Sequence, residues 1–407
     1  MSKLFYNIGL ILLKFVIYLA AIFGNTKAKD WIKGRKSWKN SISKIDNTKD
    51  SIWIHAASHG EGLMAIPLIK ELSKEFPEHQ LIISFFSPSG FQNFKYELNN
   101  LSKIYLPIDF KRNSEFILEY IKPQLLIFVK YDFWFNLINK AHELKIPTVC
   151  FSTKIDQNKW FFKPFWKWQN SSLKKFSAIL TVDKESNTIL TEKGFTNTSV
   201  SGDTRYDQVN LNATKKTELK INKPCIIVGS SWFKEEQYLN EIIEKLDEFQ
   251  IIIAPHEISK KRINDITSLF GEKSGLFSTL EKTIPKVLII DNIGILASLY
   301  ELSKIAIIGG GFSGKIHNII EPAAKENYLL FGPIIDKFPE ANEMIKHGFA
   351  KTFKNSNELL LRINEIKNHD FKKSRKFVLN KKGATEIIFK KCKEILDYSN
   401  TSASSRI

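Results

Sequence analysis

His317 and Glu321 follow three glycines, Gly309 to Gly311, that close an apolar segment, Ile305 to Ile308. The apolar segment predicts a buried strand, and HNIIEPAA after it predicts a helix, on which residues four apart share one face. A carboxylate at Glu321 could accept hydrogen bonds from two adjacent ribose hydroxyls, while the imidazole and the glycine amides could face a phosphate. The spacing fits an ordinary strand, turn and helix with a capping histidine and a solvated glutamate equally well.

Other polar residues stand where further predicted strands end, at the edge where parallel sheets bind ligands. In the first half they are Ser58, Gly60 and Glu61 after SIWIHAA, Ser87, Ser89 and Gly90 after QLIISFF, Asp132 after QLLIFV, and Arg205. In the second half they are Gly229, Ser230 and Ser231 after PCIIV, His256 after QIIIAP, and Gly310, Gly311, Lys315 and Asn318. The amides and hydroxyls of residues 229 to 231 predict a phosphate seat.

The elements that position these residues predict two α/β domains. A chain of 407 residues exceeds one ordinary domain, and the charged segment LNATKKTELKINK lacks apolar periodicity. Two Rossmann-like domains facing a central cleft describe the GT-B fold class, here with an N-terminal membrane-associated helix. The expected parts are an anchor helix 1–30, a first Rossmann-like domain 31–210, a linker 211–223, a second Rossmann-like domain 224–398 and a disordered tail 399–407.

The net charge of +17 predicts an acidic partner, which could be nucleic acid, anionic lipid or a phosphorylated substrate. Lysine is spread along the chain and no nucleic-acid-binding signature occurs, which argues against nucleic acid. Cys150, Cys225 and Cys392 lack disulfide or metal spacing and are expected to be free buried thiols in a reducing compartment.

The segment from Leu4 to Phe23 is nearly all apolar and, as a helix, would be about 30 Å long, enough to cross a bilayer. Lys3, Asn7, Lys14 and Tyr18 form a narrow polar stripe, which a helix lying in the membrane interface can keep in water. Lys14 inside a spanning helix would cost about 2.5–3.5 kcal/mol. A basic, tryptophan-containing flank follows, suited to anionic headgroups. The pattern favours a monotopic anchor, with a spanning helix and a cleaved signal peptide as the alternatives.

Several segments, in order, resemble the motifs of one enzyme family. HAASHGEG resembles A-S-x-G-E, FSPSGF resembles T-P-T-G, YLPIDF resembles Y-L-P-x-D, and GSSWFKEE resembles G-S-T-x-x-x-E-E. GGGFSGKIHNIIEPAAKENYLLFGP resembles a core that begins G-G-S, contains G-G-H-N-x-x-E-P-A, and ends F-G-P. These motifs belong to the 3-deoxy-D-manno-octulosonic acid (Kdo) transferases, which use CMP-Kdo to modify the lipid A precursor. The resemblance extends from residue 31 to 345.

The resemblance implies roles for matching residues. Glu61 would be the general base of an inverting transfer, with a capping or core role as the alternative. Glu321 would hold the cytidine ribose beside His317 and Asn318, Ser230 and Ser231 would face the phosphate, and His256 the nucleotide. Arg205 and Lys315 could contact anions or simply be solvated. The implied partners are CMP-Kdo, a lipid A precursor and the anionic cytoplasmic face of the inner membrane, and neither nucleic acid nor a cofactor is expected. The sequence contains no D-x-D motif, so a bound metal is not expected either.

Two departures concern the acceptor. The family's E-T-E-L-W-P-N reads K-Y-D-F-W-F-N, so Lys130 replaces an acidic residue and Asp132 keeps a carboxylate. The family's P-R-H-P-E-R reads A-P-H-E-I-S-K, without arginine. Either the acceptor has another phosphate pattern or other lysines compensate. The alternatives are a GT-B enzyme that uses a UDP-sugar, a sugar-nucleotide epimerase, and a non-enzymatic basic protein that binds anionic lipid or RNA.

Overall fold

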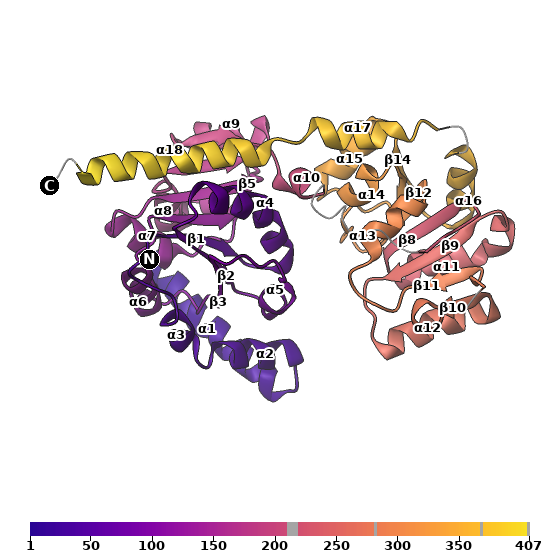
Figure 1. Ribbon diagram of the computed structural model, residues 1–407, viewed down its shortest axis with the longest axis horizontal. Helices are drawn as coiled ribbons and strands as arrows, with labels where there is room; N and C mark the ends of the chain where they lie inside the picture. The colour runs from indigo at the N-terminus through magenta and orange to yellow at the C-terminus, as the bar shows by residue number, and fades with distance from the viewer. Residues whose placement is uncertain (210–218, 281–282, 367–368, 405–407) are drawn as a thin grey trace. The chain divides into compact units, whose positions relative to one another are not determined.

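A computed structural model describes residues 1–209, 219–280, 283–366 and 369–404. The chain forms two compact units, of which unit 1 comprises Met1–Gln208 and Lys382–Ile407 and unit 2 comprises Val209–Lys381. Each unit contains one seven-stranded parallel sheet with helices on its faces (Figure 1). The predicted α/β class is therefore confirmed, with one Rossmann-like domain in each of the two units.

Unit 1 is a doubly wound sheet with strand order β3-β2-β1-β4-β5-β6-β7. Its strands are β1 (Ser51–Ala56), β2 (Gln80–Phe85), β3 (Leu101–Tyr105), β4 (Leu125–Val129), β5 (Thr148–Thr153), β6 (Ala178–Thr181) and β7 (Thr198–Val200). Its α-helices are α1 (Ser2–Ile22), α2 (Thr26–Arg35), α3 (Trp38–Ile42), α4 (His59–Glu75), α5 (Pro88–Asn93), α6 (Lys111–Ile121), α7 (Phe135–Glu143), α8 (Lys167–Leu173), α9 (Lys184–Glu192), α10 (Thr204–Gln208) and α18 (Ala384–Ser404).

Both faces of this sheet are buried because successive strand residues point to opposite faces and nearly all are apolar. In β1, Trp53 belongs to the core cluster on one face, while Ile52 and Ile54 belong to the cluster on the other. The strand order reverses between β1 and β4, which both pair with their neighbours in parallel. Ligands of doubly wound sheets bind at the carboxyl ends of strands beside such a reversal.

Unit 2 repeats this architecture with strand order β10-β11-β9-β8-β12-β13-β14. Its strands are β8 (Cys225–Ser231), β9 (Gln250–Pro255), β10 (Ser274–Leu276), β11 (Val287–Ile289), β12 (Ile305–Ile308), β13 (Tyr328–Phe331) and β14 (Ala350–Thr352). Its α-helices are α11 (Phe233–Glu241), α12 (Lys260–Phe270), α13 (Leu296–Leu299), α14 (Ile320–Ala324), α15 (Pro339–Lys346), α16 (Ser356–Glu365) and α17 (Lys372–Asn380). All three cysteines of the chain are buried and free, as predicted.

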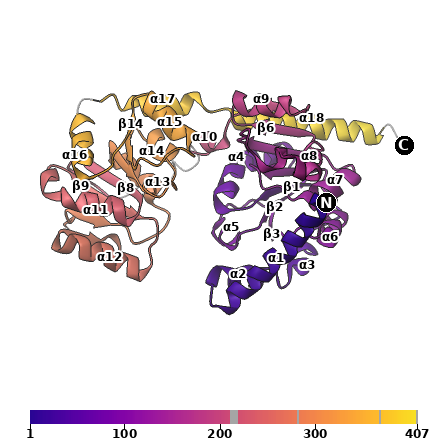
Figure 2. The ribbon, with the colours of Figure 1, turned by 180° about the vertical axis from the view of Figure 1, so that it is seen from behind.

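The last helix corrects the predicted domain boundaries. Helix α18 packs against α4 and α10 of unit 1 (Figures 1 and 2), and Asp207 accepts hydrogen bonds from Gly383 N (2.8 Å) and Thr385 N (2.7 Å) at its start. The expected second domain, 224–398, therefore extends too far, because residues from 382 belong to unit 1. The expected tail 399–407 is helical to Ser404, and residues 405–407 and most of the expected linker lie outside the described residues.

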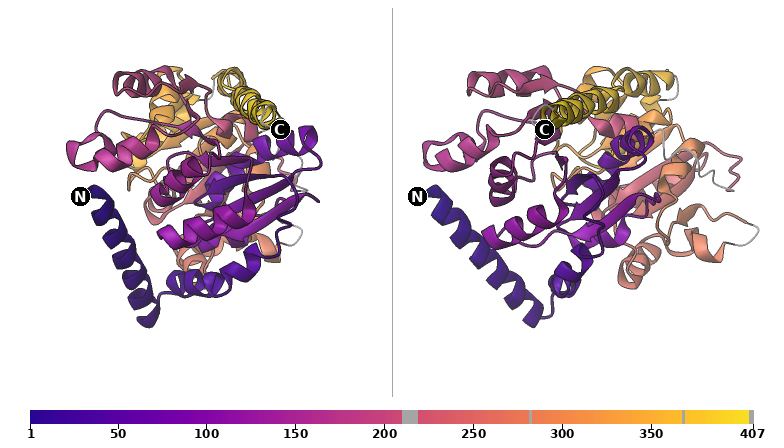
Figure 3. Two further views of the ribbon diagram at one scale, coloured as in Figure 1. Left: turned by 90° about the vertical axis from the view of Figure 1, so that its left-hand side faces the viewer. Right: turned by 60° about the vertical axis from the view of Figure 1, so that its left-hand side comes forward.

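Helix α1 lies on the outside of unit 1 (Figure 3), and two of its polar side chains contact the rest of the unit. The Tyr6 hydroxyl donates to Asp109 Oδ2 (2.7 Å), and Asn7 Oδ1 accepts from Asn136 Nδ2 (3.0 Å). Asn7 therefore contacts the protein, contrary to the predicted stripe in water. Lys3 Nζ also lies 5.7 Å from the centre of the Trp168 ring.

The outward side of α1 is apolar. It is the one helix of the described chain long and apolar enough to cross a membrane, and 11% of its most apolar window is buried. A core helix of a soluble protein would be mostly buried, so α1 is a candidate anchor rather than part of the core. Its most exposed apolar side chains are those of Leu4, Ile11, Phe15, Val16, Ile22 and Phe23.

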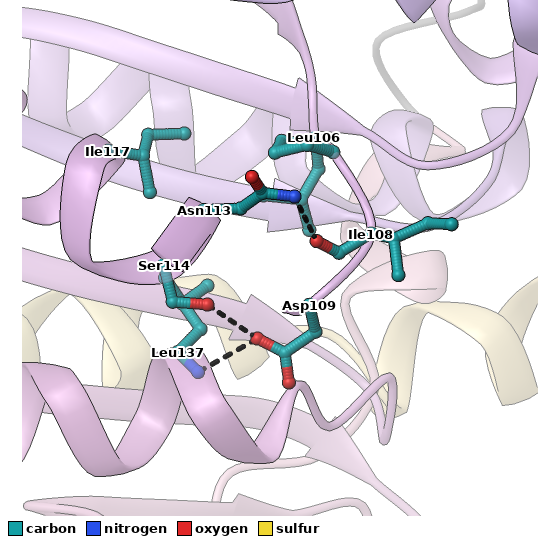
Figure 4. A pocket seen from close by; sticks show the side chains of 8 residues that line it. Leu106, Ile108, Asp109, Asn113, Ser114, Ile117 and Leu137 are labelled. Carbon is teal, nitrogen blue, oxygen red and sulfur yellow. Dashed lines mark hydrogen bonds between the residues drawn. The ribbon is translucent and has the colours of Figure 1, made fainter. Parts of the chain in front are cut away.

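Asp109 is a buried carboxylate that joins α1 to α6 and α7, and Figure 4 shows its contacts with Ser114 and Leu137. Besides Tyr6, it accepts hydrogen bonds from Ser114 Oγ (2.7 Å) and from the backbone amides of Asn136 (2.8 Å) and Leu137 (2.9 Å). Burial raises the pKa of Asp109 to about 6, against the opposing effect of these hydrogen bonds. All four donors point at the two oxygens, so this position requires a residue that only accepts.

We expect Asp109→Asn to destabilise unit 1 by about 2–4 kcal/mol. The NH₂ group of the asparagine cannot accept hydrogen bonds, so the two donors that face it would be left unpaired. The pH dependence should also change. A carboxyl pKa raised from 3.8 to about 6 by folding contributes stability below pH 3.8 that is lost as the pH rises through 6, and the variant lacks this contribution. Urea unfolding between pH 4 and 7 measures both effects. Asp50→Asn, at an exposed carboxylate of the same unit, is the control and should change stability by no more than about 0.5 kcal/mol.

Candidate active site

The predicted residues of unit 1 gather at the carboxyl ends of β1, β2 and β4, which are adjacent strands. Ser58 and Gly60 lie at the start of α4, and Ser87, the N-cap of α5, accepts from Gly90 N (2.9 Å). The two turns touch, because Ser87 N donates to Ala57 O (2.8 Å) and a Cβ at Gly90 would lie 3.1 Å from the Ser58 carbonyl carbon. Ser89 lies beside Ser87, with their hydroxyl oxygens 3.3 Å apart.

Glu61 lies in the first turn of α4, where one carboxylate oxygen, Oε2, accepts from Ser58 N (3.0 Å). The capping role considered from the sequence is therefore real, but it uses one oxygen. Among the described residues, no hydrogen bond reaches Oε1 of this half-buried carboxylate. Burial, and then the nearby charge of Asp132, raises the pKa of Glu61, whereas Lys130, His55 and the Ser58 amide oppose the rise. A carboxylate with a raised pKa and an open oxygen has the properties of a general base.

Asp132 is held by a buried hydrogen-bonded chain that sequence reasoning missed. Its Oδ2 lies 3.0 Å from His55 Nε2 and accepts from Trp134 Nε1 (2.9 Å). On the far side of the ring, His55 Nδ1 lies 2.9 Å from Ser84 Oγ. His55 and Ser84 are fully buried members of β1 and β2, and Trp134 is also buried. A histidine inside an otherwise apolar strand was the available signal, because a buried imidazole needs partners.

In unit 2, the predicted turns also lie on adjacent strands, β9, β8 and β12. Ser231 is buried and its hydroxyl donates to Glu236 Oε1 (2.6 Å), so of the serine pair Ser230 is the more accessible. Glu236 also pairs with Arg262. The buried side chains of Glu235 and Glu236 therefore stabilise this turn through contacts within the protein.

The glycine amides are already used within the protein. Gly309 N donates to Gly229 O (3.0 Å), and Gly310 N donates to Glu235 Oε1 (2.9 Å). The expectation that these two amides face a phosphate is therefore wrong for this structure. A Cβ at Gly311 would lie 2.4 Å from Gly332 N, so this glycine permits a close backbone approach. The glycines therefore shape the turn at the end of β12, and the amides of Gly309 and Gly310 are not offered to a ligand.

His317 and Glu321 do not share a helical face, because α14 begins only at Ile320 and the five residues before it are irregular. His317 instead stacks on His256, with ring centres 4.2 Å apart, and His256 stacks on Trp232 at 5.0 Å. Trp232 Nε1 donates to His317 Nε2 (2.9 Å). Burial and the neighbouring His256 lower the pKa of His317 to about 4, so the ring is neutral at neutral pH, with its proton on Nδ1.

Trp232 was missed as a site residue. It is 40% exposed and forms one end of the stack with the two predicted histidines. Flat rings of this kind can stack on a nucleobase. A large aromatic directly after a strand-end serine pair was the signal in the sequence.

The remaining predicted residues lie around this stack. Asn318 Oδ1 accepts from Ile320 N (3.0 Å) and starts α14, and Lys315 is exposed. Glu321 is half-buried. Burial of Tyr300 raises the pKa of that residue, and the charge of Glu321 raises it further. The Tyr300 hydroxyl lies against Gly229. Arg205, in unit 1, pairs with Asp203 (2.7 Å). In the described parts of the chain, no group of three or more His, Cys, Asp or Glu residues could hold a metal ion.

Comparison with known proteins identifies similar chains. A family model described as 3-deoxy-D-manno-octulosonic-acid transferase matches residues 33–208. A 3-deoxy-D-manno-octulosonic acid transferase of Aquifex aeolicus is 26% identical over 79% of this chain and 87% of its own length. One of Rickettsia bellii is 25% identical over 88% of this chain and 89% of its own.

The fold also resembles solved structures. The UDP-GlcNAc 2-epimerase of Neisseria meningitidis, solved with UDP-GlcNAc bound, has a TM-score of 0.63 at 14% identity and covers 84% of this chain and 100% of its own. At this identity the likeness concerns the fold alone. With the two parallel sheets, it confirms the predicted GT-B class.

Proposed function

We propose that this chain is a Kdo transferase that moves Kdo from CMP-Kdo to a lipid A precursor with inversion, because relatives of that name are 25–28% identical to it over 74–88% of its length. The observation that carries the proposal is Glu61, a half-buried carboxylate with one open oxygen at the carboxyl edge of the unit 1 sheet. In the reaction, Glu61 takes the proton of an acceptor hydroxyl, the hydroxyl oxygen bonds to the anomeric carbon, and the bond from that carbon to the CMP phosphate breaks.

Unit 2 supplies the donor site in this proposal. The Trp232, His256 and His317 rings offer a surface for the cytosine, and Glu321 accepts from the ribose hydroxyls. His317 donates through Nδ1 as a neutral ring, and Ser230 and Lys315 face the phosphate. Hydrogen bonds and positive charge stabilise the leaving phosphate, which needs no bound metal.

The acceptor site lies in unit 1. Ser58, Gly60, Ser87, Ser89 and Gly90 form its two touching turns, and Asp132 with Lys130 replaces the family's pair of acidic residues. A lysine beside Glu61 favours an acceptor that carries phosphate near the reacting hydroxyl.

We further propose that α1 is a monotopic anchor at the cytoplasmic face of an anionic inner membrane. Tyr6 and Asn7 attach the helix to unit 1, so its outward apolar side can enter the interface while the helix stays on the protein. A spanning helix would have to give up these contacts. Binding to vesicles should therefore leave the α1 residues accessible to reagents from one side of the membrane only.

The reaction is tested with purified protein, CMP-Kdo and an acylated, phosphorylated glucosamine disaccharide, with products read by mass spectrometry. Addition of Kdo and release of CMP support the proposal. An active relative is assayed in parallel, and if that relative forms product while this protein forms none, the proposal is overturned. A UDP-sugar transferase or an epimerase is the second candidate, because similar solved structures include UDP-GlcNAc 2-epimerases. Stabilisation by CMP but not UDP in thermal denaturation separates the two.

A further inference from the structure

A cavity of about 710 Å³ in unit 1 lies between α1 and the segment after β4. Its size falls within the roughly 300–1,000 Å³ of ligand pockets. Helix α1 contributes Phe5 and Gly9, the segment after β4 contributes Tyr131 and Asp132, and the 3₁₀ turns at Trp160–Phe162 and Pro164–Trp166 complete the wall. Most of these side chains are aromatic, and Asp132 is the one carboxylate among those that line it.

The aromatic side chains of the wall are partly open to solvent although they contact one another. Phe5 packs on Phe165 with ring centres 5.3 Å apart, and Trp160 packs on Trp166 at 4.8 Å. Trp160 is 42% exposed and Tyr131 is 50% exposed. Aromatic surface that the fold leaves in water is costly unless something covers it.

The cavity continues the apolar side of α1. Phe5 lines the cavity and is itself exposed, and Ile8 and Leu12, three and seven residues further along the same side of the helix, are exposed as well, so the surface proposed to enter the membrane leads into the cavity. Gly9 keeps the cavity wide, because a Cβ there would meet no atom within 4 Å. Glycine inside a helix costs roughly 0.5–1 kcal/mol relative to alanine, so its presence here favours a role for the open space.

The cavity also reaches the proposed reaction site. Asp132 lines it, and Asp132 Oδ2 lies 3.0 Å from Nε2 of His55 in β1, the strand that leads into the first turn of α4 and Glu61. Lys159 lies at the wall with its Nζ 5.3 Å from the centre of the Tyr131 ring. A molecule with an apolar tail in the cavity would therefore place a polar head near Asp132, with a cation nearby.

We propose that this cavity, between α1 and the aromatic turns at 160–166, binds one acyl chain of the lipid acceptor and thereby positions the acceptor headgroup at Glu61. The inference rests on the proposed function, because that function supplies an acylated acceptor. It adds a specificity determinant: transfer should depend on an acyl chain that enters the protein rather than on membrane attachment alone.

Gly9→Leu tests this, because Gly9 lines the cavity and a Cβ there would meet no atom within 4 Å, so a larger side chain takes up space in the cavity. We expect KM for a detergent-dispersed acylated acceptor to rise about tenfold or more in the variant. The same disaccharide without acyl chains should be used with equal kcat/KM by wild type and variant. Leu12→Phe adds bulk at an exposed α1 position that does not line the cavity and is the control. Equal loss with both acceptors, or no loss with either, overturns the inference.

A binding experiment keeps this inference separate from the proposed reaction. An acylated disaccharide with bromine on its acyl chain should quench tryptophan fluorescence, and Trp160→Phe with Trp166→Phe should remove much of the quenching, whether or not Kdo is transferred. Absence of quenching overturns the inference even if transfer occurs. If brominated phospholipid vesicles quench these tryptophans and the acceptor does not, the cavity binds membrane lipid instead, which also overturns it.

Discussion

Glu61→Gln is expected to lower the rate of Kdo transfer by about 10²–10⁴-fold, the usual contribution of a general base. Glutamine keeps the size of the side chain, and its carbonyl oxygen can still accept from Ser58 N, so the start of α4 is preserved. What the variant loses is the ability to take a proton. CMP binding should remain at the wild-type level, because the proposed donor site lies in unit 2.

The pH dependence gives an independent check. The base must be ionised, so kcat/KM should rise with pH through the raised pKa of Glu61 and level off above it. Asp132→Asn removes the negative charge that helps to raise this pKa, so the rising limb should move to lower pH. A capping role alone predicts no such movement.

Glu71→Gln is the matched control, since Glu71 is a carboxylate of the same helix that pairs with Lys74 (2.9 Å) at the surface. It should retain wild-type activity. Full transfer activity in Glu61→Gln would remove Glu61 from the chemistry and leave it as a helix cap. Thermal denaturation shows whether the variant has lost stability as well as activity. Glu61→Ala lacks the cap altogether, and its expected loss of stability, about 0.5–2 kcal/mol, gives the size of the capping contribution.

The sequence was sufficient to place the candidate site residues at the ends of strands, because parallel strands follow a simple rule. Apolar runs marked the strands, and the polar residues that followed β1, β2, β4, β8, β9 and β12 lie at common edges of the two sheets. That step needs only the period of the pattern and the topology of a doubly wound sheet. Residues such as Glu61 and His256 were therefore predictable before any coordinates were known.

What each side chain does at that edge could not be predicted, because it depends on contacts between residues distant in the sequence. Gly310 N is used by Glu235, 75 residues away, and His317 accepts from Trp232, 85 residues away. Helical spacing at 317–321 was misleading because the chain stays irregular until Ile320. The return of α18 to unit 1 depends likewise on Asp207, which caps it across 176 residues.

Gly309→Ala is expected to have the largest effect in unit 2. A Cβ at this position would lie 1.9 Å from Ser230 O and 2.9 Å from Ser231 Cα, and all its close neighbours are backbone atoms. No rotamer change can relieve such a clash, so β8 and β12 must move apart, and the hydrogen bond from Gly309 N to Gly229 O (3.0 Å) must lengthen or break.

The expected result is a destabilisation of about 3 kcal/mol or more, at the upper end of overpacking effects, and loss of the rise in melting temperature that CMP causes in the wild type. The turn at 229–231 carries Ser230 and leads directly into Trp232, so displacement of β8 would disturb both the phosphate contact and the ring stack. Gly60→Ala is the control for stability, because a Cβ there meets nothing within 4 Å and the melting temperature should not change. Wild-type CMP affinity in Gly309→Ala would mean that the close approach of the two turns is unnecessary for the donor site, and that the nucleotide binds elsewhere on unit 2.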